Sequence, residues 1–461
     1  MKSLDKYLRS PFFNQRPAIL KLWELIQPCH PDFSDPLLDR TALSRHLFDR
    51  EQEDLQALRY LFSDLTKLCD GFLAYQTWQS KTTEVQLHLL QAYDQRGLSK
   101  YYDTYSKKVE HHLISPVPDS TETFTKRFLF REQQHLSDQN AQARGSAYPV
   151  ETVIESLDQL YLAKKLRYSC EGINRANVFQ EQSQMFLIQP LTVELASFPH
   201  LHSPLIDLYL LAFQTLAKDN HEPAYFQLKN GLTQAPKELN RAELRNLYSL
   251  ALNYCIKRLN QGHEPFAREI FDLYKTLVRE RIIYEQNALA VAHFKNIVTL
   301  GARLKEFEWT ENFIETYQSD LAVEQASNAV AYNLANLLFA KGDFRRVLQL
   351  LRSVEFTDVF LQMDAKSILV KTYFELEDYD GLGYLLSSFK MILRRDKRLS
   401  SYQHRLYSNL IKFTRLLIRF QLDHTVTLAY IEDQLKKHPD IAGGSWIREK
   451  LASFAHPKKE S

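Results

Sequence analysis

The chain has 461 residues, enough for two or three globular domains or for one continuous array of helical repeats. Its formal net charge is only +2, which excludes a strong overall attraction to nucleic acid or to anionic lipid. Glycine occurs 12 times, whereas an average composition of about 7% would give roughly 32. Because hairpins and bulges depend on glycine, this scarcity predicts a mostly helical protein.

The cysteines and the apolar segments indicate the compartment. Cys29, Cys69, Cys170 and Cys255 have no paired spacing, which argues against a zinc knuckle or a redox motif. Each of them except Cys29 lies in an apolar helical pattern, so we expect these three to be buried free thiols, in a reducing environment. The first residues lack an apolar core of signal-peptide length, and no segment has the ~20 uninterrupted apolar residues of a membrane span. A cytoplasmic protein without membrane contact is therefore expected.

Helices are predicted throughout the first 200 residues, where apolar side chains recur at three- and four-residue spacings without a regular repeat. The segment Asp119-Ser120-Thr121-Glu122 can cap the helix that starts at 121, and its acidic first turn would complement the helix dipole. The polar segment 141–149 is expected to be a loop. The expected helices are 16–27, 41–48, 52–73, 82–95, 99–112 and 121–140, with one or two further helices over 150–175.

From residue 200 onward the pattern becomes repetitive. Five units, each of two apolar helices around a short turn, cover about 202 to 396. Their turns are expected near 220, 262, 305, 342 and 377. A sixth hairpin is predicted from the apolar residues between 406 and 420 and between 428 and 435.

Residues 328–351 show the repeat best. Two amphipathic helices flank the turn Lys341-Gly342-Asp343-Phe344, and a small residue, Ala335, is expected where they cross closely. This stretch resembles a tetratricopeptide (TPR) unit, a helix-turn-helix of about 34 residues. One such unit cannot bury its own apolar face, so the resemblance implies stacked neighbours.

The sequence therefore predicts an all-α protein, in which an N-terminal helical region is followed by a TPR-like α-solenoid, a right-handed superhelix of helix pairs. The expected domains are an N-terminal helical domain at 1–118, connecting helices at 119–199, TPR-like repeats at 200–439, and a C-terminal helix with a basic tail at 440–461.

The resemblance implies a binding groove, because the first helix of each TPR pair lines a concave face that binds a protein or peptide. The implied partner-binding residues are Tyr332 and Asn336 and, one repeat further, Lys371 and Phe374. Asn336 matches the position where peptide-binding members hydrogen-bond a ligand backbone. Tyr332 replaces a lysine that grips a carboxylate terminus, so a chaperone-tail clamp is not expected. The competing interpretation is packing between repeats, which is favoured for Phe339.

Basic residues gather toward the C-terminus. From Lys390 to the end there are 15 Lys and Arg against 7 Asp and Glu, or +8. Arg405, Lys412, Arg415 and Arg419 recur along one face of a predicted helix. This basic surface suits an acidic partner or a nucleic-acid backbone. A solvated outer face neutralised by a neighbouring repeat is favoured, because the excess is modest.

A rival hypothesis is a peptide-sensing or DNA-binding transcriptional regulator. Residues 38–48 and 55–72 are compatible with two helices of a helix-turn-helix, with 72–78 as a strand-like wing. The would-be recognition helix is acidic, and phosphate repels acidic side chains, so binding to nucleic acid is not expected. Its acidic residues are Glu51, Glu53, Asp54 and Asp64.

Motifs of catalysis were sought without success. The chain has no P-loop, GxGxxG, GxSxG or HExxH motif. His200 and His202 have no third ligand in their loop, and His221 and His263 lack a second histidine at the required spacing, so no metal is expected. A non-enzymatic scaffold or adaptor without a cofactor is the leading hypothesis. The sequence defines no oligomeric state.

Two further segments, residues 7–14 (Tyr-Leu-Arg-Ser-Pro-Phe-Phe-Asn) and 160–167 (Leu-Tyr-Leu-Ala-Lys-Lys-Leu-Arg), resemble those of an uncharacterised bacterial family of long helical proteins. That resemblance implies no activity.

Overall fold

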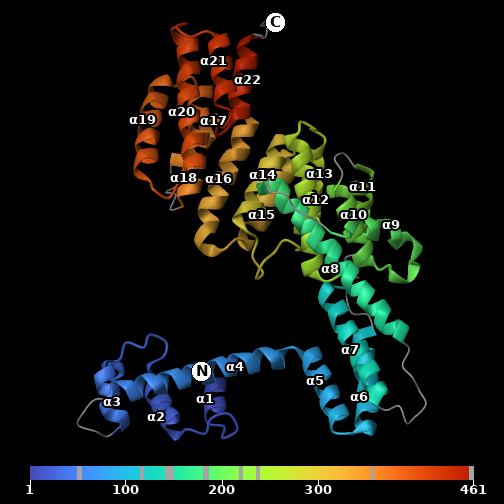
Figure 1. Cartoon of the computed structure of the whole chain (residues 1–461). Coiled ribbons are helices and arrows are strands. Elements are labelled where there is room, and N and C mark those ends of the chain that lie inside the picture. Colours follow the sequence, from blue (N-terminus) through green and yellow to red (C-terminus); the bar gives the residue numbers. More distant parts are fainter. Residues whose placement is uncertain are drawn as a thin grey trace. The chain divides into compact units, whose positions relative to one another are not determined.

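The computed structural model describes residues 1–48, 54–114, 119–140, 150–179, 186–217, 222–234, 239–352, 354 and 358–455. These residues are dominated by helices α1 to α22 and contain no strand, only two isolated bridges (Figure 1). The predicted all-α fold is confirmed. The predicted loop at 141–149 and the turn near 220 lie outside the described residues.

The chain divides into two compact units. The first unit comprises Met1–Ser169, Gln184–Leu210 and Ala235–Asn240, and the second comprises Cys170–Ser183, Leu211–Gln234 and Arg241–Ser461. The predicted domain boundaries stay a prediction.

Seven of the first ten helices, α2 to α8, correspond to expected ones, although α4 runs seven residues further than expected; α1 and α9 were not among those expected, and α8 and α10 continue into the second unit. They are α1 (Lys2–Leu8), α2 (Pro17–Ile26), α3 (Arg40–Phe48), α4 (Leu55–Ser80), α5 (Thr82–Gln95), α6 (Ser99–Ile114), α7 (Thr121–Asn140), α8 (Val150–Phe179), α9 (Ile188–Glu194) and α10 (Pro204–Ala217). Helices α1 to α4 bury an apolar core that includes Leu8, Leu22 and Trp23. A second core in α5, α6 and α7 includes Leu90 and Phe130.

Helix α4 runs without interruption to Ser80, so the predicted strand-like wing at 72–78 is wrong. Phe72, Tyr75 and Trp78 recur every three residues, which suits a helix face and not the two-residue alternation of a strand. Tyr7 of α1 packs against this face, with ring centroids 5.4 Å from Phe72 and 6.2 Å from Tyr75. The helix-turn-helix interpretation therefore lacks the strand-like wing that it requires.

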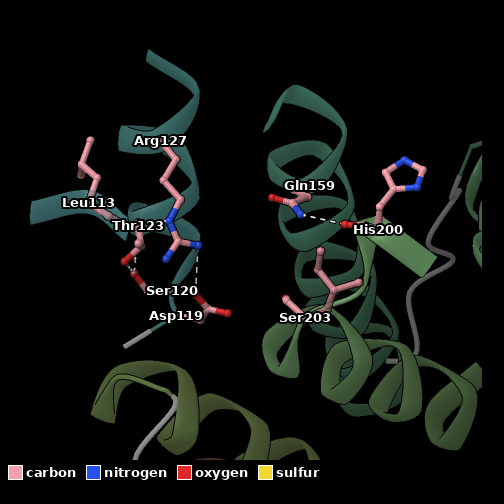
Figure 2. A network of polar contacts seen from close by, with 9 residues as sticks. Leu113, Asp119, Ser120, Thr123, Arg127, Gln159, His200 and Ser203 are labelled. Carbon is pink, nitrogen blue, oxygen red and sulfur yellow. Dashed lines mark hydrogen bonds and ion pairs between the residues drawn. The ribbon is translucent and has the colours of Figure 1, made fainter. Parts of the chain in front are cut away.

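The start of α7 is fixed by polar contacts within the first unit. Ser120 Oγ accepts a hydrogen bond from the Thr123 amide at 3.0 Å, which confirms the predicted cap. Figure 2 shows Arg127 reaching from α7 toward Asp119, whose Oδ1 lies 3.1 Å from its guanidinium. Arg127 Nε also donates to the Leu113 carbonyl at 3.1 Å, so one side chain joins the end of α6 to the start of α7.

The second unit continues as a series of helix pairs. Helices α12, α14, α16, α18 and α20 each pack against the next helix in sequence, and α14, α16, α18 and α20 also contact one another in succession. We call α12, α14, α16, α18 and α20 the first helices of these pairs. The helices are α11 (Glu222–Gln234), α12 (Arg241–Asn260), α13 (Phe266–Arg279), α14 (Val291–Arg303), α15 (Phe307–Tyr317), α16 (Val323–Lys341), α17 (Phe344–Arg352), α18 (Val359–Glu375), α19 (Tyr379–Arg395), α20 (Ser401–Leu422), α21 (Leu428–Lys437) and α22 (Gly444–Ala455).

The same turn ends four first helices. Gly262, Lys305, Gly342 and Glu377 all have positive φ, between 57° and 93°. In each case the amide of the following residue donates to the carbonyl five positions back, as Asp343 does to Leu338 at 3.0 Å. This hydrogen bond is characteristic of the Schellman motif, which satisfies carbonyls that a helix end would leave unpaired. The turns predicted near 262, 305, 342 and 377 are therefore confirmed.

Candidate functional site

The predicted partner-binding residues lie on first helices of the second unit. We call these side chains, with those that contact them and lie near them on the first helices, the first-helix row. The row comprises Lys295 and Thr299 of α14, Tyr332, Asn336 and Phe339 of α16, Asp364, Lys371 and Glu375 of α18, and Tyr407 of α20.

An ion pair anchors one end of the row. Lys295 pairs with the carboxylate of Asp364, and its ammonium also stands 5.3 Å from the centroid of the Tyr332 ring. The Tyr407 hydroxyl donates to Asp364 Oδ1 at 3.0 Å. Tyr332 is only 7% exposed, and burial raises the pKa of its hydroxyl well above the ordinary value. Four helices are thus tied together by a cluster in which Tyr332 is the residue that the resemblance assigned to a partner.

Asn336 lies in the middle of the row and is half-buried. Its amide nitrogen donates to Thr299 Oγ1 at 3.3 Å, from α16 to the exposed side chain on α14. Among the described residues it makes no other side-chain hydrogen bond. A carboxamide has two donors and two acceptor sites, so Asn336 has capacity left for a ligand.

Lys371 lies one repeat further and is also half-buried. Its ammonium stands 5.1 Å from the centroid of the Phe339 ring. Burial lowers the pKa of Lys371, although Asp364, Glu449 and Glu375 oppose that shift. No carboxylate of the described residues lies within ion-pair distance of it. Lys371 is therefore a cation held by an aromatic face and by more distant charges.

Phe374 and Glu375 are covered by the chain itself. Phe374 is 4% exposed, and Trp446 of α22 contacts it edge-on, with the ring centroids 5.3 Å apart. Trp446 Nε1 donates to Glu375 Oε1 at 2.6 Å, and Lys450 pairs with the same carboxylate. The structure thus gives Tyr332 and Phe374 packing roles, and it leaves Asn336 and Lys371 partly accessible. Whether a partner binds any of the four stays a prediction.

The basic surface of α20 is where the sequence places it, on one face of the helix. Arg405 pairs with Asp440 at 3.1 Å, which partly bears out the expected neutralisation. Lys412 donates to the neutral Gln434 Oε1 at 2.9 Å. Arg415 and Arg419 are exposed and form no ion pair with any described residue.

A depression of about 350 Å³ lies against this face. It is lined by Lys390 of α19 and by Ser408, Ile411, Lys412, Arg415, Leu416 and Arg419 of α20. Sequence reasoning missed Lys390 as a member of the site, because only the packing of α19 on α20 brings it there. The sequence feature that could have indicated Lys390 is the excess of positive charge that begins at that residue.

A smaller cavity of about 170 Å³ lies in the first unit, where Arg127 and Arg131 of α7 meet residues 152–159 of α8. Two of its charged groups are already paired, since Arg127 contacts Asp119 at 3.1 Å and Arg131 contacts Glu110 at 2.8 Å. Gln159 donates to the His200 carbonyl at 3.2 Å, as Figure 2 shows. These contacts hold helices together and leave little charge for a ligand.

Of the histidines and cysteines considered for chemistry, His221 lies outside the described residues. His202 Nδ1 lies 2.5 Å from Asp207 Oδ1, and its Nε2 lies 3.2 Å from the Leu195 carbonyl. The described residues contain no group of three or more His, Cys, Asp or Glu side chains that could hold a metal. Burial raises the pKa of the Cys255 thiol to about 12. Cys170 is buried as predicted, whereas Cys69 is only half-buried.

None of the helices among the described residues combines the length and the apolar character needed to cross a bilayer. Comparisons with protein-family models, with curated proteins and with solved structures gave no match to the chain.

Proposed function

We propose that this protein is a non-enzymatic scaffold or adaptor that binds another protein or a peptide across its first helices. The observation that supports the proposal best is the repeated turn at Gly262, Lys305, Gly342 and Glu377, which sets helix pairs one after another. Arrays of such pairs present long surfaces that suit extended polypeptides. A TPR-like right-handed superhelix is part of this proposal.

The partner is proposed to lie along the α14–α16 part of the first-helix row. Thr299 is exposed and Asn336 is half-buried there, whereas Trp446 covers Phe374 and Glu375 of α18. Asn336 offers the donors and acceptors that an extended backbone requires. Lys371 adds a positive charge one repeat away.

The experiment compares capture of partners by the wild type and by the double variant Asn336→Ala/Lys371→Ala, with cross-linking and mass spectrometry as the readout. Loss of direct contacts should weaken binding by about 1 to 3 kcal/mol. The matched control is Asn312→Ala/Lys397→Ala, which removes the same two residue types from exposed positions outside the row. Circular dichroism establishes that all three proteins are folded. Equal recovery of every partner by both variants would reject the row as the binding surface.

A further inference from the structure

We propose that the depression between α19 and α20 binds an acidic peptide segment that carries an apolar side chain among its carboxylates. This surface is distinct from the first-helix row, so the inference does not rest on the proposed groove. It concerns the four cations Lys390, Lys412, Arg415 and Arg419 and the two apolar residues Ile411 and Leu416.

The charge of the depression is not neutralised from within. Lys390, Arg415 and Arg419 are exposed, and none of them forms an ion pair with a described residue. Lys412 is turned toward an uncharged amide, Gln434 Oε1. The nearby Arg405, by contrast, is paired with Asp440 and lies outside the lining. The positive charge is therefore concentrated where the surface is hollowed, which favours an anionic ligand.

The shape of the charged surface favours a peptide over a nucleic acid. Lys412 and Arg419, with Arg415 between them, are seven positions apart on α20, or about 10 Å. Binding of a nucleic-acid strand relies on a longer track of cations and on aromatic side chains that stack on bases. None of the residues that line the depression is aromatic. Arginine guanidinium groups bind carboxylates through two parallel hydrogen bonds.

Two apolar residues of the depression provide a second basis for recognising the peptide. Ile411 is buried and Leu416 is half-buried, and both line the depression. A volume of about 350 Å³ exceeds what a single carboxylate fills, so an apolar side chain of the ligand can occupy the remainder. We therefore expect a peptide of mixed acidic and apolar character to bind more tightly than a purely acidic one.

The experiment measures fluorescence anisotropy of a labelled peptide of glutamate interrupted by leucine, with the full-length protein at low and at high salt. Arg415→Glu/Arg419→Glu and Lys390→Glu should each weaken binding by about tenfold or more, because they place negative charge against the peptide. Arg394→Glu is the matched control, since Arg394 is exposed one turn further along α19 and outside the lining. It should change the affinity less than about threefold.

Three results would overturn the proposal. If Arg394→Glu and Lys390→Glu weaken binding equally, the peptide responds only to the overall positive charge of this part of the protein and not to the depression. An all-glutamate peptide that binds as tightly as the leucine-containing one would remove the role of Ile411 and Leu416. A single-stranded or duplex oligonucleotide that binds more tightly than both peptides would assign the depression to nucleic acid. The variant Asn336→Ala/Lys371→Ala should leave the peptide affinity unchanged, which separates this test from that of the groove.

Discussion

Trp446 packs edge-on against Phe374, with an angle of 89° between the ring planes, and hydrogen-bonds the neighbouring Glu375. This contact fixes the C-terminal helix α22 on α18, at a position where resemblance to TPR units implied an exposed groove. Both rings are at least 95% buried. The end of the helical array is thus closed by the chain itself, which shortens the surface left for a partner.

Removing the Trp446 side chain should destabilise the protein strongly. Trp446→Ala deletes a buried aromatic ring and leaves Glu375 with one donor fewer, so we expect a loss of about 3 to 5 kcal/mol in the free energy of unfolding. Urea unfolding measures it. Tyr384→Ala, at a side chain that is 82% exposed on α19, is the control and should change stability by less than about 0.5 kcal/mol. Equal stabilities would show that α22 contributes nothing to the core.

Replacing Gly342 or Gly383 by alanine should have opposite effects on stability. A Cβ added at Gly342 meets nothing within 4 Å, but its φ of +82° is unfavourable for any other residue. Gly342→Ala should therefore cost about 1 kcal/mol, through the backbone alone. Gly383 in α19 also has free space, without a positive φ, so Gly383→Ala should stabilise the protein by about 0.5 to 1 kcal/mol. Thermal unfolding of both variants tests the assignment, and destabilisation by both would contradict it.

The same turn explains how far the repeats could be predicted from the sequence. Only two of the four positions, Gly262 and Gly342, carry the glycine that marks a left-handed turn. Lys305 and Glu377 adopt the same conformation at a cost of about 1 to 2 kcal/mol each, which tertiary packing offsets. Periodicity of apolar residues therefore located these turns, whereas a search for glycine would have missed half of them.

Ala335 tests the packing inside the best-defined pair. Its side chain is fully buried in the core shared by α16, α17 and α18. Ala335→Leu should overpack that core and cost about 1 to 3 kcal/mol. Ala340→Leu, on the same helix at an exposed position, should stay within about 0.5 kcal/mol of the wild type. A melting temperature unchanged by Ala335→Leu would mean that the helices of this pair do not cross closely there.

The candidate sites show what a single sequence cannot predict. The helix face that carries Arg415 and Arg419 followed from spacing alone, because a helix repeats every 3.6 residues. The polar cluster beside Tyr332 did not, since Lys295, Asp364 and Tyr407, which contact one another, come from three other helices up to 75 residues away. Local patterns contain no information on which polar groups satisfy one another across helices. For that reason the sequence assigned to a ligand several groups that the fold pairs internally.

His202 and Asp207 predict a pH dependence in the first unit. The hydrogen bond that His202 donates to the Asp207 carboxylate is the largest cause that raises the pKa of His202 above its ordinary value of 6.5. A raised pKa in the folded state means that the protonated form is stabilised by folding. The stabilisation is fully present below the unfolded pKa of about 6.5 and is lost as pH rises through the folded value. We therefore expect the difference in melting temperature between wild type and His202→Gln to be largest in mildly acidic buffer and to shrink toward alkaline pH.

Asp207→Asn should flatten this dependence, because the imidazole then has no carboxylate beside it. An NMR titration that places the pKa of His202 at or below 6.5 would contradict the argument.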